Sequence, residues 1–491
     1  MSSARRVVVV GGGLAGITAA LDCAAAGARV TLVEVRRRLG GAAYSVTREG
    51  LQMDNGQHVF LRGCLAYRAL LGRLGSEHLV SVQPRLEIPV LRPGSRPFHL
   101  RRSSLPAPLH LAGALARYPF LSRRRRLGAA RAALALMRID PREERDDRIT
   151  LGEWLARHGQ GPQEVAALWD LIALPTLNLP AAEASLALGV FVFRTGLLTS
   201  ADGGDIGFHV ATLQEIIGGP AERALRAAGV EVRLGWRAES LQPTAGGLEV
   251  GGRGGRGTAL AHRADGATGA VGEEEEMWVA GGPEGEDGLS AEAVVLAVPH
   301  TRAASLLEPL LGDLSGRLRA LGASPIVNLH VVYDRTVCEQ AFAAGVGTPV
   351  QYLFDRSRAA GAPAGCQYLA VSLSGADREM GMSVDELRER FLPALTALLP
   401  RAREATVESF LVTREHAATF RSRPGVGALR PGPETAVAGL VLAGTWTATG
   451  WPATLEGAVL SGHAAAVAAL RRVGIEPPRV RSSLDPLGVH R

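Results

Sequence analysis

The sequence contains no lysine, so all 54 basic residues among its 491 positions are arginines. Schiff-base chemistry, the phosphate-binding lysine of a Walker loop and a lysine general base all need that residue, and each is therefore excluded. Cysteine is scarce as well: the four cysteines lie far apart, with no CxxC or metal-ligand spacing. We expect no disulfide framework, no metal site and a reducing, cytoplasmic compartment.

The chain also lacks any run of 18 uncharged apolar residues, which argues against a membrane-spanning helix. Its hydrophobic content of 46% excludes disorder over most of its length, and its length predicts two or three domains. The net charge of +6 indicates mild attraction to anionic surfaces. Without clustering, that charge does not indicate a nucleic-acid partner, and we expect none.

The first 34 residues follow the pattern of a nucleotide-binding βαβ unit. An apolar, β-branched run at 6–10 predicts a buried parallel strand, 17–26 predicts a helix, and 29–34 predicts a second strand. A GxGxxG motif joins the first strand to the helix. The start of such a helix offers unpaired N–H groups and a positive dipole end to a phosphate, so the unit predicts dinucleotide binding.

The glycines of this motif are Gly11, Gly13 and Gly16. Gly11 allows a tight turn, Gly13 lets the backbone approach a pyrophosphate, and Gly16 lets the helix pack on the strand. Glu34 ends the second strand, where its carboxylate is placed to accept hydrogen bonds from ribose hydroxyls. An acid at that position disfavours a 2′-phosphate on the ribose.

The motif continues into Arg36, Gly40 and Gly41, and here the sequence resembles the GR2-type flavoproteins, the superfamily of amine oxidases and phytoene desaturases. The resemblance implies that Glu34, Arg36 and the glycine pair clasp FAD. The family usually has an arginine directly after the glycine pair, whereas this chain has Ala42. One contact to the phosphates or the flavin is therefore missing or supplied from elsewhere.

Residues 439–462 resemble the closing motif of the same superfamily, a strand followed by a loop and a helix. The resemblance implies that Gly444 approaches a phosphate and that the start of the helix faces the pyrimidine end of the flavin. A helix dipole in that place stabilises the anionic reduced flavin. The backbone N–H groups implied at the ring are those of Ala453, Thr454 and Leu455.

Two further positions belong to this resemblance. Val232, in the strand predicted at 230–234, matches a residue whose backbone pairs with adenine, and an ordinary sheet edge is the alternative. Glu456, in the first turn of the last helix, is either part of the flavin contact or a capping acid.

The predicted fold is α/β: a Rossmann-like FAD-binding domain built from discontinuous segments, with an α+β substrate domain that has a helical, membrane-facing part. We expect residues 243–292, rich in glycine and charge, to form a flexible surface insertion and residues 476–491 to form a mobile tail. The FAD-binding segments are 1–80, 205–300 and 425–475, and the substrate-domain segments are 81–204 and 301–424. The pattern predicts a strand pair at 48–60, helices at 63–75, 208–228, 384–398 and 453–471, and strands at 293–298, 326–333, 367–373 and 439–443.

The most specific segment is 50–61, with the sequence GLQMDNGQHVFL. Together with stretches at 105–111, 177–198 and 450–459, it resembles the squalene-associated FAD-dependent enzymes of the hydroxysqualene dehydroxylase type. The resemblance implies reductive removal of an allylic hydroxyl from a C30 isoprenoid, which gives squalene. It also implies an isoprenoid lipid as substrate and a separate reductant, which the sequence does not identify, that recharges the flavin.

Loss of water from an allylic alcohol leaves a delocalised cation, which a hydride from reduced flavin quenches. Such a site needs a proton donor, an apolar channel and exclusion of water. His58 is the candidate acid, and a structural histidine bonded to backbone is the alternative. Asp54 either holds the loop through an Asx-turn with Gly56, orients His58 or takes part directly. Gln57 is placed to contact the edge of the flavin.

Residues 98–138 combine leucine, alanine and phenylalanine with many arginines, including the run at 123–126. A basic amphipathic helical pair of this kind can lie on an anionic membrane with its apolar residues dipping in. An ordinary helix with a solvated arginine face is the alternative. We expect a peripheral protein on the inner face of the membrane, from which an isoprenoid substrate would come.

Two other functions remain open. A carotenoid or phytoene-type desaturase would use the same cofactor in the opposite direction, and a flavin-containing lipid-binding protein would show no turnover. A soluble amine oxidase is least favoured, because those enzymes generally place a lysine near the flavin N5 and use an aromatic cage. This chain has no lysine and only 5% aromatic residues.

Overall fold

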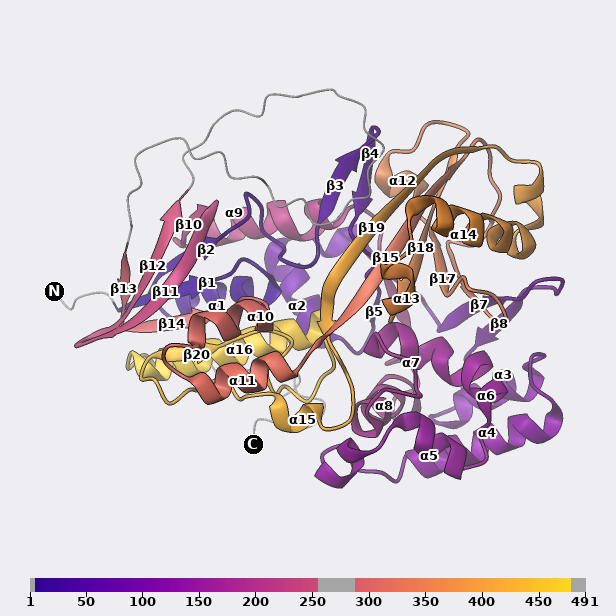
Figure 1. Ribbon diagram of the computed structural model, residues 1–491, viewed down its shortest axis with the longest axis horizontal. Helices are drawn as coiled ribbons and strands as arrows, with labels where there is room; N and C mark the ends of the chain where they lie inside the picture. Colours follow the sequence, from indigo (N-terminus) through magenta and orange to yellow (C-terminus); the bar gives the residue numbers. More distant parts are fainter. Residues whose placement is uncertain (1–4, 255–287, 478–491) are drawn as a thin grey trace.

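The computed structural model describes residues 5–254 and 288–477 (Figure 1). The expected βαβ unit is confirmed: β1 (Arg6–Val10) leads through α1 (Leu14–Ala25) to β2 (Arg29–Glu34). The four valines of β1 are buried. Their burial follows from the position of β1 inside a parallel sheet that is covered on both faces.

A five-stranded parallel sheet brings three distant parts of the chain together. Its order is β10–β2–β1–β14–β20, and every neighbouring pair is parallel. The three other strands come from the segments in which strands were expected: β10 (Glu231–Leu234), β14 (Ala293–Leu296) and β20 (Leu440–Leu442). The dinucleotide-binding fold is therefore discontinuous in sequence.

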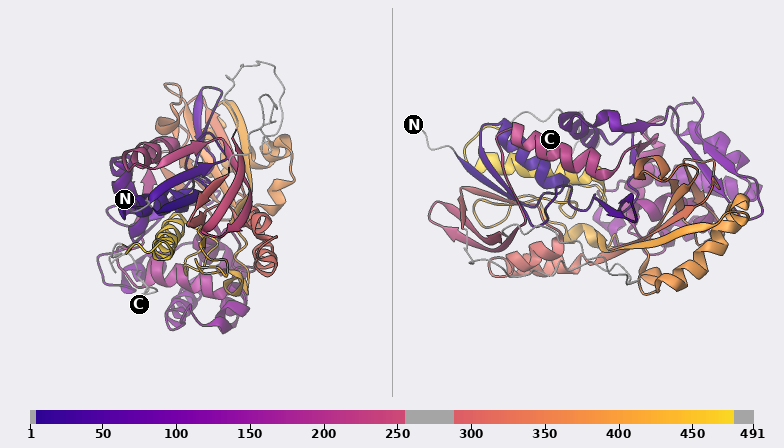
Figure 2. Two further views of the ribbon diagram at one scale, coloured as in Figure 1. Left: turned by 90° about the vertical axis from the view of Figure 1, so that its left-hand side faces the viewer. Right: turned by 90° about the horizontal axis from the view of Figure 1, so that it is seen from above.

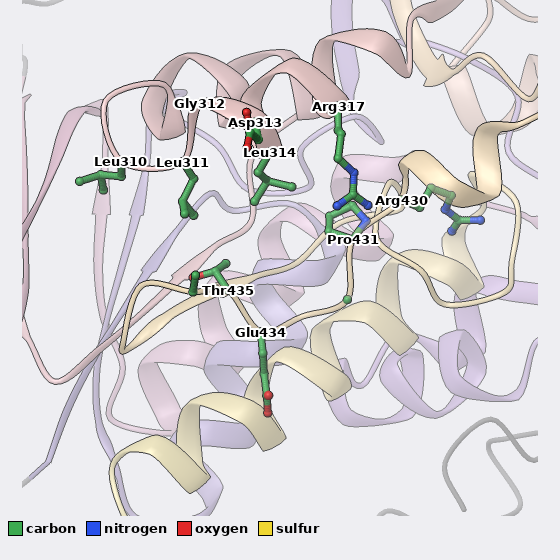
Figure 3. A pocket seen from close by; sticks show the side chains of 12 residues that line it. Leu310, Leu311, Gly312, Asp313, Leu314, Arg317, Arg430, Pro431, Glu434 and Thr435 are labelled. Atoms are coloured by element: carbon green, nitrogen blue, oxygen red, sulfur yellow. The ribbon is translucent and has the colours of Figure 1, made fainter.

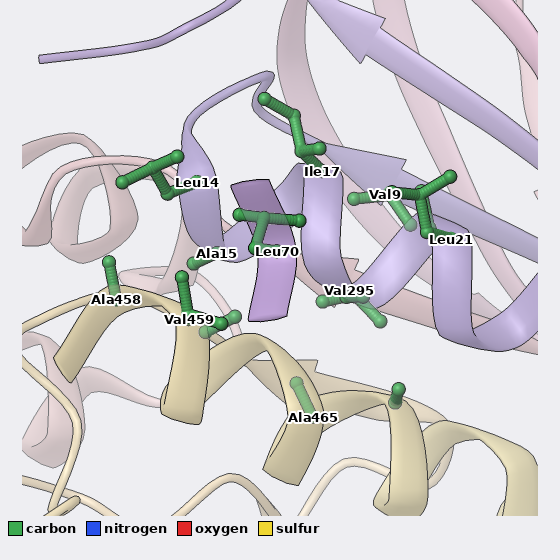
Figure 4. Close-up of a cluster of buried hydrophobic side chains, with 14 of the residues drawn as sticks. Val9, Leu14, Ala15, Ile17, Leu21, Leu70, Val295, Ala458, Val459 and Ala465 are labelled. Carbon is green, nitrogen blue, oxygen red and sulfur yellow. The ribbon is translucent and has the colours of Figure 1, made fainter. Parts of the chain in front are cut away.

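One face of this sheet is covered by α1 and by α16 (Leu455–Arg472), which pack along each other (Figure 4). Their approach is close because small residues line the contact: a Cβ on Gly462 would stand 2.4 Å from the carbonyl oxygen of Ala15. Val9, Val295 and Val459 belong to the same buried cluster. Helices from the two ends of the described chain thus share one core.

The other face is covered by a three-stranded antiparallel sheet and two helices. Val8 and Val294 point into this core, together with Leu248 and Leu307. The helices belong to the segment predicted for the substrate domain, yet they pack on the dinucleotide-binding sheet. The elements are β11 (Trp236–Thr244), β12 (Gly247–Gly254), β13 (Leu289–Ala291), α10 (His300–Leu307) and α11 (Gly312–Ala320).

A seven-stranded sheet forms the second half of the molecule, at the opposite end of the long axis (Figure 2). Two of its inner strands are β15 (Ala323–Tyr333) and β18 (Gln367–Ser374), which pair with each other, and α14 (Val384–Leu398) packs on one face. Alternate residues of β15 point to the other face. The remaining strands, in order along the sheet, are β19 (Val407–Phe420) before β15, and β17 (Tyr352–Asp355), β16 (Phe342–Gly345), β7 (Glu87–Leu91) and β8 (Phe98–Arg101) after β18.

A helical lobe lies beside this sheet, at the lower right of Figure 1. It contains α3 (Ala112–Arg117), α4 (Arg123–Leu136), α5 (Leu151–Arg157), α6 (Pro162–Glu164), α7 (Asp170–Leu177) and α8 (Leu186–Phe193). The other elements are β3 (Ser45–Arg48), β4 (Leu51–Asp54), β5 (Phe60–Leu61), β6 (Val80–Val82), β9 (Ile206–His209), α2 (Leu65–Leu74), α9 (Gly219–Ala227), α12 (Ser357–Ala360), α13 (Asp377–Met380) and α15 (Val426–Leu429), with π-helical turns at Val165–Trp169, Arg194–Leu198 and Gln214–Gly218.

Two expectations from the sequence are wrong in part. The helix predicted over 208–228 starts too early, because Phe208 and His209 belong to β9, which pairs with β5 and β6. The insertion predicted over 243–292 is ordered at both ends, as β12 and β13, where Leu248 and Val250 alternate into the core. The high glycine content of this stretch hid that alternation. Residues 255–287 and 478–491, with most of the predicted insertion and tail, lie outside the described residues.

Among the described helices, none is long and apolar enough to cross a membrane. The four cysteines are free, and three of them are buried.

Candidate active site

The two glycine motifs at the N-terminus contact each other and form a backbone cradle. Gly11 has a φ of +111°, and a Cβ on Gly16 would stand 1.9 Å from the carbonyl oxygen of Gly11. A Cβ on Gly41 would stand 2.7 Å from the Cα of Gly13, and the Gly40 N–H donates to the Gly12 carbonyl at 2.9 Å. Only glycine fits these approaches. No described side chain caps the start of α1, so its first N–H groups can bind an anion.

Glu34 lies beside this cradle and is buried. Its Oε2 accepts a hydrogen bond from the Gly12 N–H at 2.6 Å, and its Oε1 accepts one from the Arg36 N–H at 2.8 Å. The carboxylate thus fixes the turn on both sides, and each oxygen retains a free lone pair. Its predicted contact with a ribose stays a prediction, as does that of the exposed Arg36 side chain.

Gly444 begins the C-terminal part of the site with a φ of +139°. Its N–H donates to Ser461 Oγ at 2.7 Å, and a Cβ there would stand 2.4 Å from Trp446 Nε1. Thr454 caps α16, since its Oγ1 accepts the Gly457 N–H at 3.1 Å. The flanking Ala453 and Leu455 are half-buried.

Val232 lies in β10, the edge strand of the parallel sheet, opposite Leu32. An edge strand keeps backbone groups that are unpaired in its own sheet. The adenine contact of Val232 stays a prediction.

Glu456 is a capping acid, but for a different helix from its own. Its two carboxylate oxygens accept the N–H groups of Ala66 and Tyr67 at 2.9 and 2.7 Å, in the first turn of α2. Burial raises the pKa of this carboxyl to about 7, against the lowering effect of those hydrogen bonds. The first turns of α2 and α16 are thereby joined.

The loop predicted to carry the chemistry begins at Asp54, which is buried and bonded through both oxygens. Oδ1 accepts from Ser45 Oγ at 2.7 Å and from the Leu213 N–H at 2.9 Å, and Oδ2 accepts from Arg356 Nη2 at 2.8 Å. Among the described residues Asp54 makes no side-chain bond to Gly56, so the expected Asx-turn is not formed. Its bonds favour the loop-holding role over direct catalysis.

Asn55 ties this loop to the glycine cradle. Its Nδ2 donates to the carbonyl of Ala42 at 3.0 Å and to Glu415 Oε1 at 2.8 Å, and its Oδ1 accepts the Tyr44 N–H at 3.1 Å. Ala42 directly follows the glycine pair. The DNGQH segment therefore starts at the cradle itself.

Asn328 of β15 contacts the same loop and was missed from the sequence. Its Nδ2 donates to the Asn55 carbonyl at 2.7 Å, while its buried Oδ1 has no partner among the described residues. The Nε2 of Gln57 is likewise buried and unpartnered there. Buried polar atoms without partners are rare and indicate a ligand or water that completes them.

His58 is half-buried, and its imidazole makes no hydrogen bond to the described residues. Its Nε2 and the Nδ2 of Asn328 each lie 3.7 Å from where a Cβ on Gly56 would stand, so both side chains flank this glycine. Burial lowers the pKa of His58, and the charge of Asp54 partly offsets that shift. His58 is therefore less basic than an exposed histidine.

Residues 14–470 match the family model described as flavin containing amine oxidoreductase. The chain belongs to this family. Its relatives include the hydroxysqualene dehydroxylases of Rhodopseudomonas palustris, 29% identical over 94% of this chain and 97% of that protein, and of Sinorhizobium fredii, 27% identical over 95% and 98%. Zeta-carotene desaturase of Synechocystis is 24% identical over 95% of this chain and 97% of that protein.

Among solved structures, wild-type putrescine oxidase superposes with a TM-score of 0.69 at 18% identity, covering 96% of this chain and 99% of that one. This likeness shows the fold. Members of the flavin-containing amine oxidoreductase family bind a flavin, and the residues present fit one: the glycine cradle has no room for a Cβ, the start of α1 has no side-chain cap, and Gln57 and Asn328 hold unpartnered polar atoms.

Arg38 lies close to the position where the flavoprotein family usually has an arginine and this chain has Ala42. Its guanidinium lies over the Tyr44 ring at 3.7 Å, and Nη1 donates to the Gly41 carbonyl at 3.3 Å. Arg38 can therefore supply a positive charge beside the glycine pair.

A cavity of about 680 Å³ lies elsewhere, between α11 and the segment 430–436 (Figure 3). Leu311, Leu314 and Arg317 project into it from one side and Pro431 and Thr435 from the other. Neither the glycine cradle nor the DNGQH loop contributes to its lining, so we do not assign the flavin or substrate site to it.

Proposed function

We propose that this flavoprotein binds FAD and removes the allylic hydroxyl of hydroxysqualene to give squalene. The observation that carries the proposal is the loop Asp54–His58: it begins at the glycine cradle, carries an unbonded imidazole and an unpartnered amide, and lies in a chain that resembles a dehydroxylase over 94% of its length. The absence of lysine supports the same choice over amine oxidation.

The role of the protein side chains follows from the balance of the reaction. The C–O bond of the substrate breaks, the hydroxyl leaves as water with one added proton, and the carbon gains a hydride. The glycine cradle would hold FAD, which in its reduced form would supply that hydride. His58 donates the proton, because it is the titratable side chain of the loop whose ring is not already engaged.

Asn328 and Gln57 can orient the reacting groups. The free Oδ1 of Asn328 can accept a hydrogen bond from the substrate hydroxyl or from the ring of His58, and the free Nε2 of Gln57 can donate to the flavin edge. Buried donors and acceptors that are held in advance lose little entropy on binding, which favours the reacting geometry.

The decisive experiment is anaerobic turnover of the purified protein with FAD, dithionite and hydroxysqualene, followed by mass analysis of the product. Squalene is expected, and omission of FAD is the control. A second incubation offers phytoene and an electron acceptor: loss of two hydrogens there, with no squalene in the first, would assign a desaturase instead. If both substrates are bound yet unchanged, the protein is a lipid carrier.

We further propose that α4 rests on an anionic membrane from which the isoprenoid enters. The exposed face of this helix alternates basic and apolar side chains, Arg124, Leu127, Arg131 and Leu134, with both leucines about half exposed, and the exposed Arg138 follows the end of the helix. Two arginines of the predicted cluster are engaged elsewhere: Arg125 pairs with Glu164, and Arg126 donates to the Leu121 carbonyl. The remaining face fits an interfacial helix whose arginines reach lipid phosphates.

Co-sedimentation with phosphatidylglycerol vesicles tests this surface. Changing Arg124, Arg131 and Arg138 to Gln should lower the bound fraction several-fold, and added salt should lower it for the wild type. A control variant with Arg223, Arg226 and Arg471 changed to Gln removes the same charge from the FAD-binding half and should bind as the wild type does. Equal losses in both variants would refute a specific surface.

A further inference from the structure

Two buried histidines hold the backbone of the DNGQH loop at two carbonyls, those of Asn55 and His58. His209 of β9 contacts the carbonyl of His58, and a chain that starts at His330 of β15 ends on the carbonyl of Asn55. Both rings are almost fully buried, at 4% and 1% exposure, so neither can reach a substrate. Neither was singled out from the sequence.

The first hold has a defined direction. A carbonyl oxygen only accepts, so His209 Nδ1 carries the proton that it shares with the His58 carbonyl at 2.7 Å. His209 Nε2 then accepts a hydrogen bond from the hydroxyl of the buried Tyr67 at 2.7 Å. Burial lowers the pKa of His209 to about 3, which keeps this arrangement neutral at ordinary pH.

In the second hold the hydrogen bonds again point from the histidine toward the loop carbonyl. Thr413 Oγ1 donates to the Asn55 carbonyl at 3.3 Å and can therefore accept from His330 Nε2 at 3.0 Å. His330 Nδ1 then accepts a hydrogen bond from the Tyr368 hydroxyl at 2.6 Å. Burial lowers the pKa of His330 to about 4, so this chain is neutral as well.

Between the two held carbonyls lie Gly56 and Gln57. Glycine has the greatest backbone freedom of any residue, and Gln57 has no side-chain partner among the described residues to fix it. A loop of this composition would move unless its ends were held. Arg356 strengthens the first hold, since it bonds Asp54 and also donates to the carbonyl of His209.

We infer that two tyrosine–histidine pairs fix the loop so that the His58 imidazole stays aimed at the reacting hydroxyl. One pair is Tyr67–His209, and the other is Tyr368–His330, which acts through Thr413. The inference rests on the proposed function for its catalytic meaning. His209 and Thr413 are its positioning residues, and they act through His58 without touching substrate.

The test compares His209→Leu, which removes the donor at similar volume, with His209→Asn, which keeps a donor where Nδ1 stood. In the FAD-loaded full chain, His209→Leu should lower kcat for hydroxysqualene about 10- to 100-fold, with KM and the Kd for FAD changed less than about two-fold. His209→Asn should recover most of kcat. In a His58→Ala background, His209→Leu should cost less than a further factor of about two.

A second readout does not depend on turnover. Twelve histidines are present, and the ¹³Cε1 signal of His58 in histidine-labelled protein is assigned by its loss in His58→Ala. His209→Leu should shift or split that signal, in the absence and presence of FAD, and His209→Asn should restore it. If the protein does not act on hydroxysqualene, this spectrum still decides whether His209 positions His58, so the two failures are distinguishable.

The second hold, through Thr413, supplies an independent variant if His209→Leu does not fold. Thr413→Val keeps the shape but removes the hydroxyl, and Thr413→Ser keeps the hydroxyl. Thr413→Val should lower kcat several-fold and shift the His58 signal, while Thr413→Ser should match the wild type. The inference would be overturned if His209→Leu or Thr413→Val lowered kcat equally in the wild type and in the His58→Ala background. It would also be overturned if the variants that fold left the His58 signal unmoved.

Discussion

The glycine cradle and the DNGQH loop are built in different ways. The cradle is local backbone: Gly11, Gly16 and Gly41 create it by having no side chain. The DNGQH loop is held by side chains that come from far along the sequence, such as Arg356, 302 positions from Asp54. A local motif thus shapes the cradle, whereas long-range hydrogen bonds hold the loop that carries His58, the proposed proton donor.

Gly16→Ala should break the first region and has the largest expected effect. The added Cβ would stand 1.9 Å from the carbonyl oxygen of Gly11, so α1 must move away from β1 and the cradle opens. The purified protein should be colourless, with no flavin absorbance after reconstitution. Gly316→Ala in α11, where no atom lies within 4 Å of the new Cβ, should bind FAD normally. A yellow Gly16→Ala protein would contradict the clash.

Arg356→Met should break the second region and leave the first intact. The change leaves the buried carboxylate of Asp54 without its cation, at a cost of about 3–5 kcal/mol in the free energy of unfolding. We expect a lower Tm and little turnover but retained FAD. Differential scanning calorimetry measures the Tm, and the flavin spectrum measures the bound FAD. If Arg356→Met lost as much FAD as Gly16→Ala, the two regions would not be distinct.

Glu456 joins the start of α16 to the start of α2, and its titration adds a third kind of hold to the comparison. The unfolded carboxyl has a pKa near 4.5 and the folded one a pKa of about 7, so the unfolded chain releases its proton first as the pH rises. The stability that this group contributes is full below pH 4.5 and is lost by about pH 7, a change of roughly 3 kcal/mol. Chemical denaturation from pH 5 to 8 should show this fall in the wild type and a flatter profile in Glu456→Gln. Parallel profiles would contradict the raised pKa.

The smallest expected effect concerns the proton donor alone. The pKa of His58 is lowered below its usual 6.5, so its acid form is depleted near neutrality. The rate of hydroxysqualene reduction should rise as the pH falls from 8 to 6, up to about ten-fold per unit. His58→Gln should abolish that slope. An unchanged slope in this variant would assign the acid to another group.

The sequence predicted the cradle well because strand, glycines, helix and Glu34 follow one another within a short stretch. It also located the loop Asp54–His58, since the segment is unusual. The holds on that loop could not be predicted: His209, His330, Asn328 and Arg356 are isolated polar residues in ordinary strands or loops, and only the folded chain brings them together.

Misplaced elements have a similar cause. The pattern extends the predicted helix into Phe208 and His209 because these residues precede a strong helical pattern, whereas the pairing of β9 with β5 and β6 is long-range. The true partner of Glu456 was hidden in the same way, since α2 is remote in sequence.

The packing of α1 against α16 has a consequence for synthesis. The ribosome makes α16 long after α1, on the order of tens of seconds later at ordinary elongation rates. Until then α1 and β1 lack the helix that completes their core, and the emerging chain exposes their apolar surface. We therefore expect flavin capture to follow translation of residue 470, and chaperones that shield nascent chains to determine the yield of loaded protein.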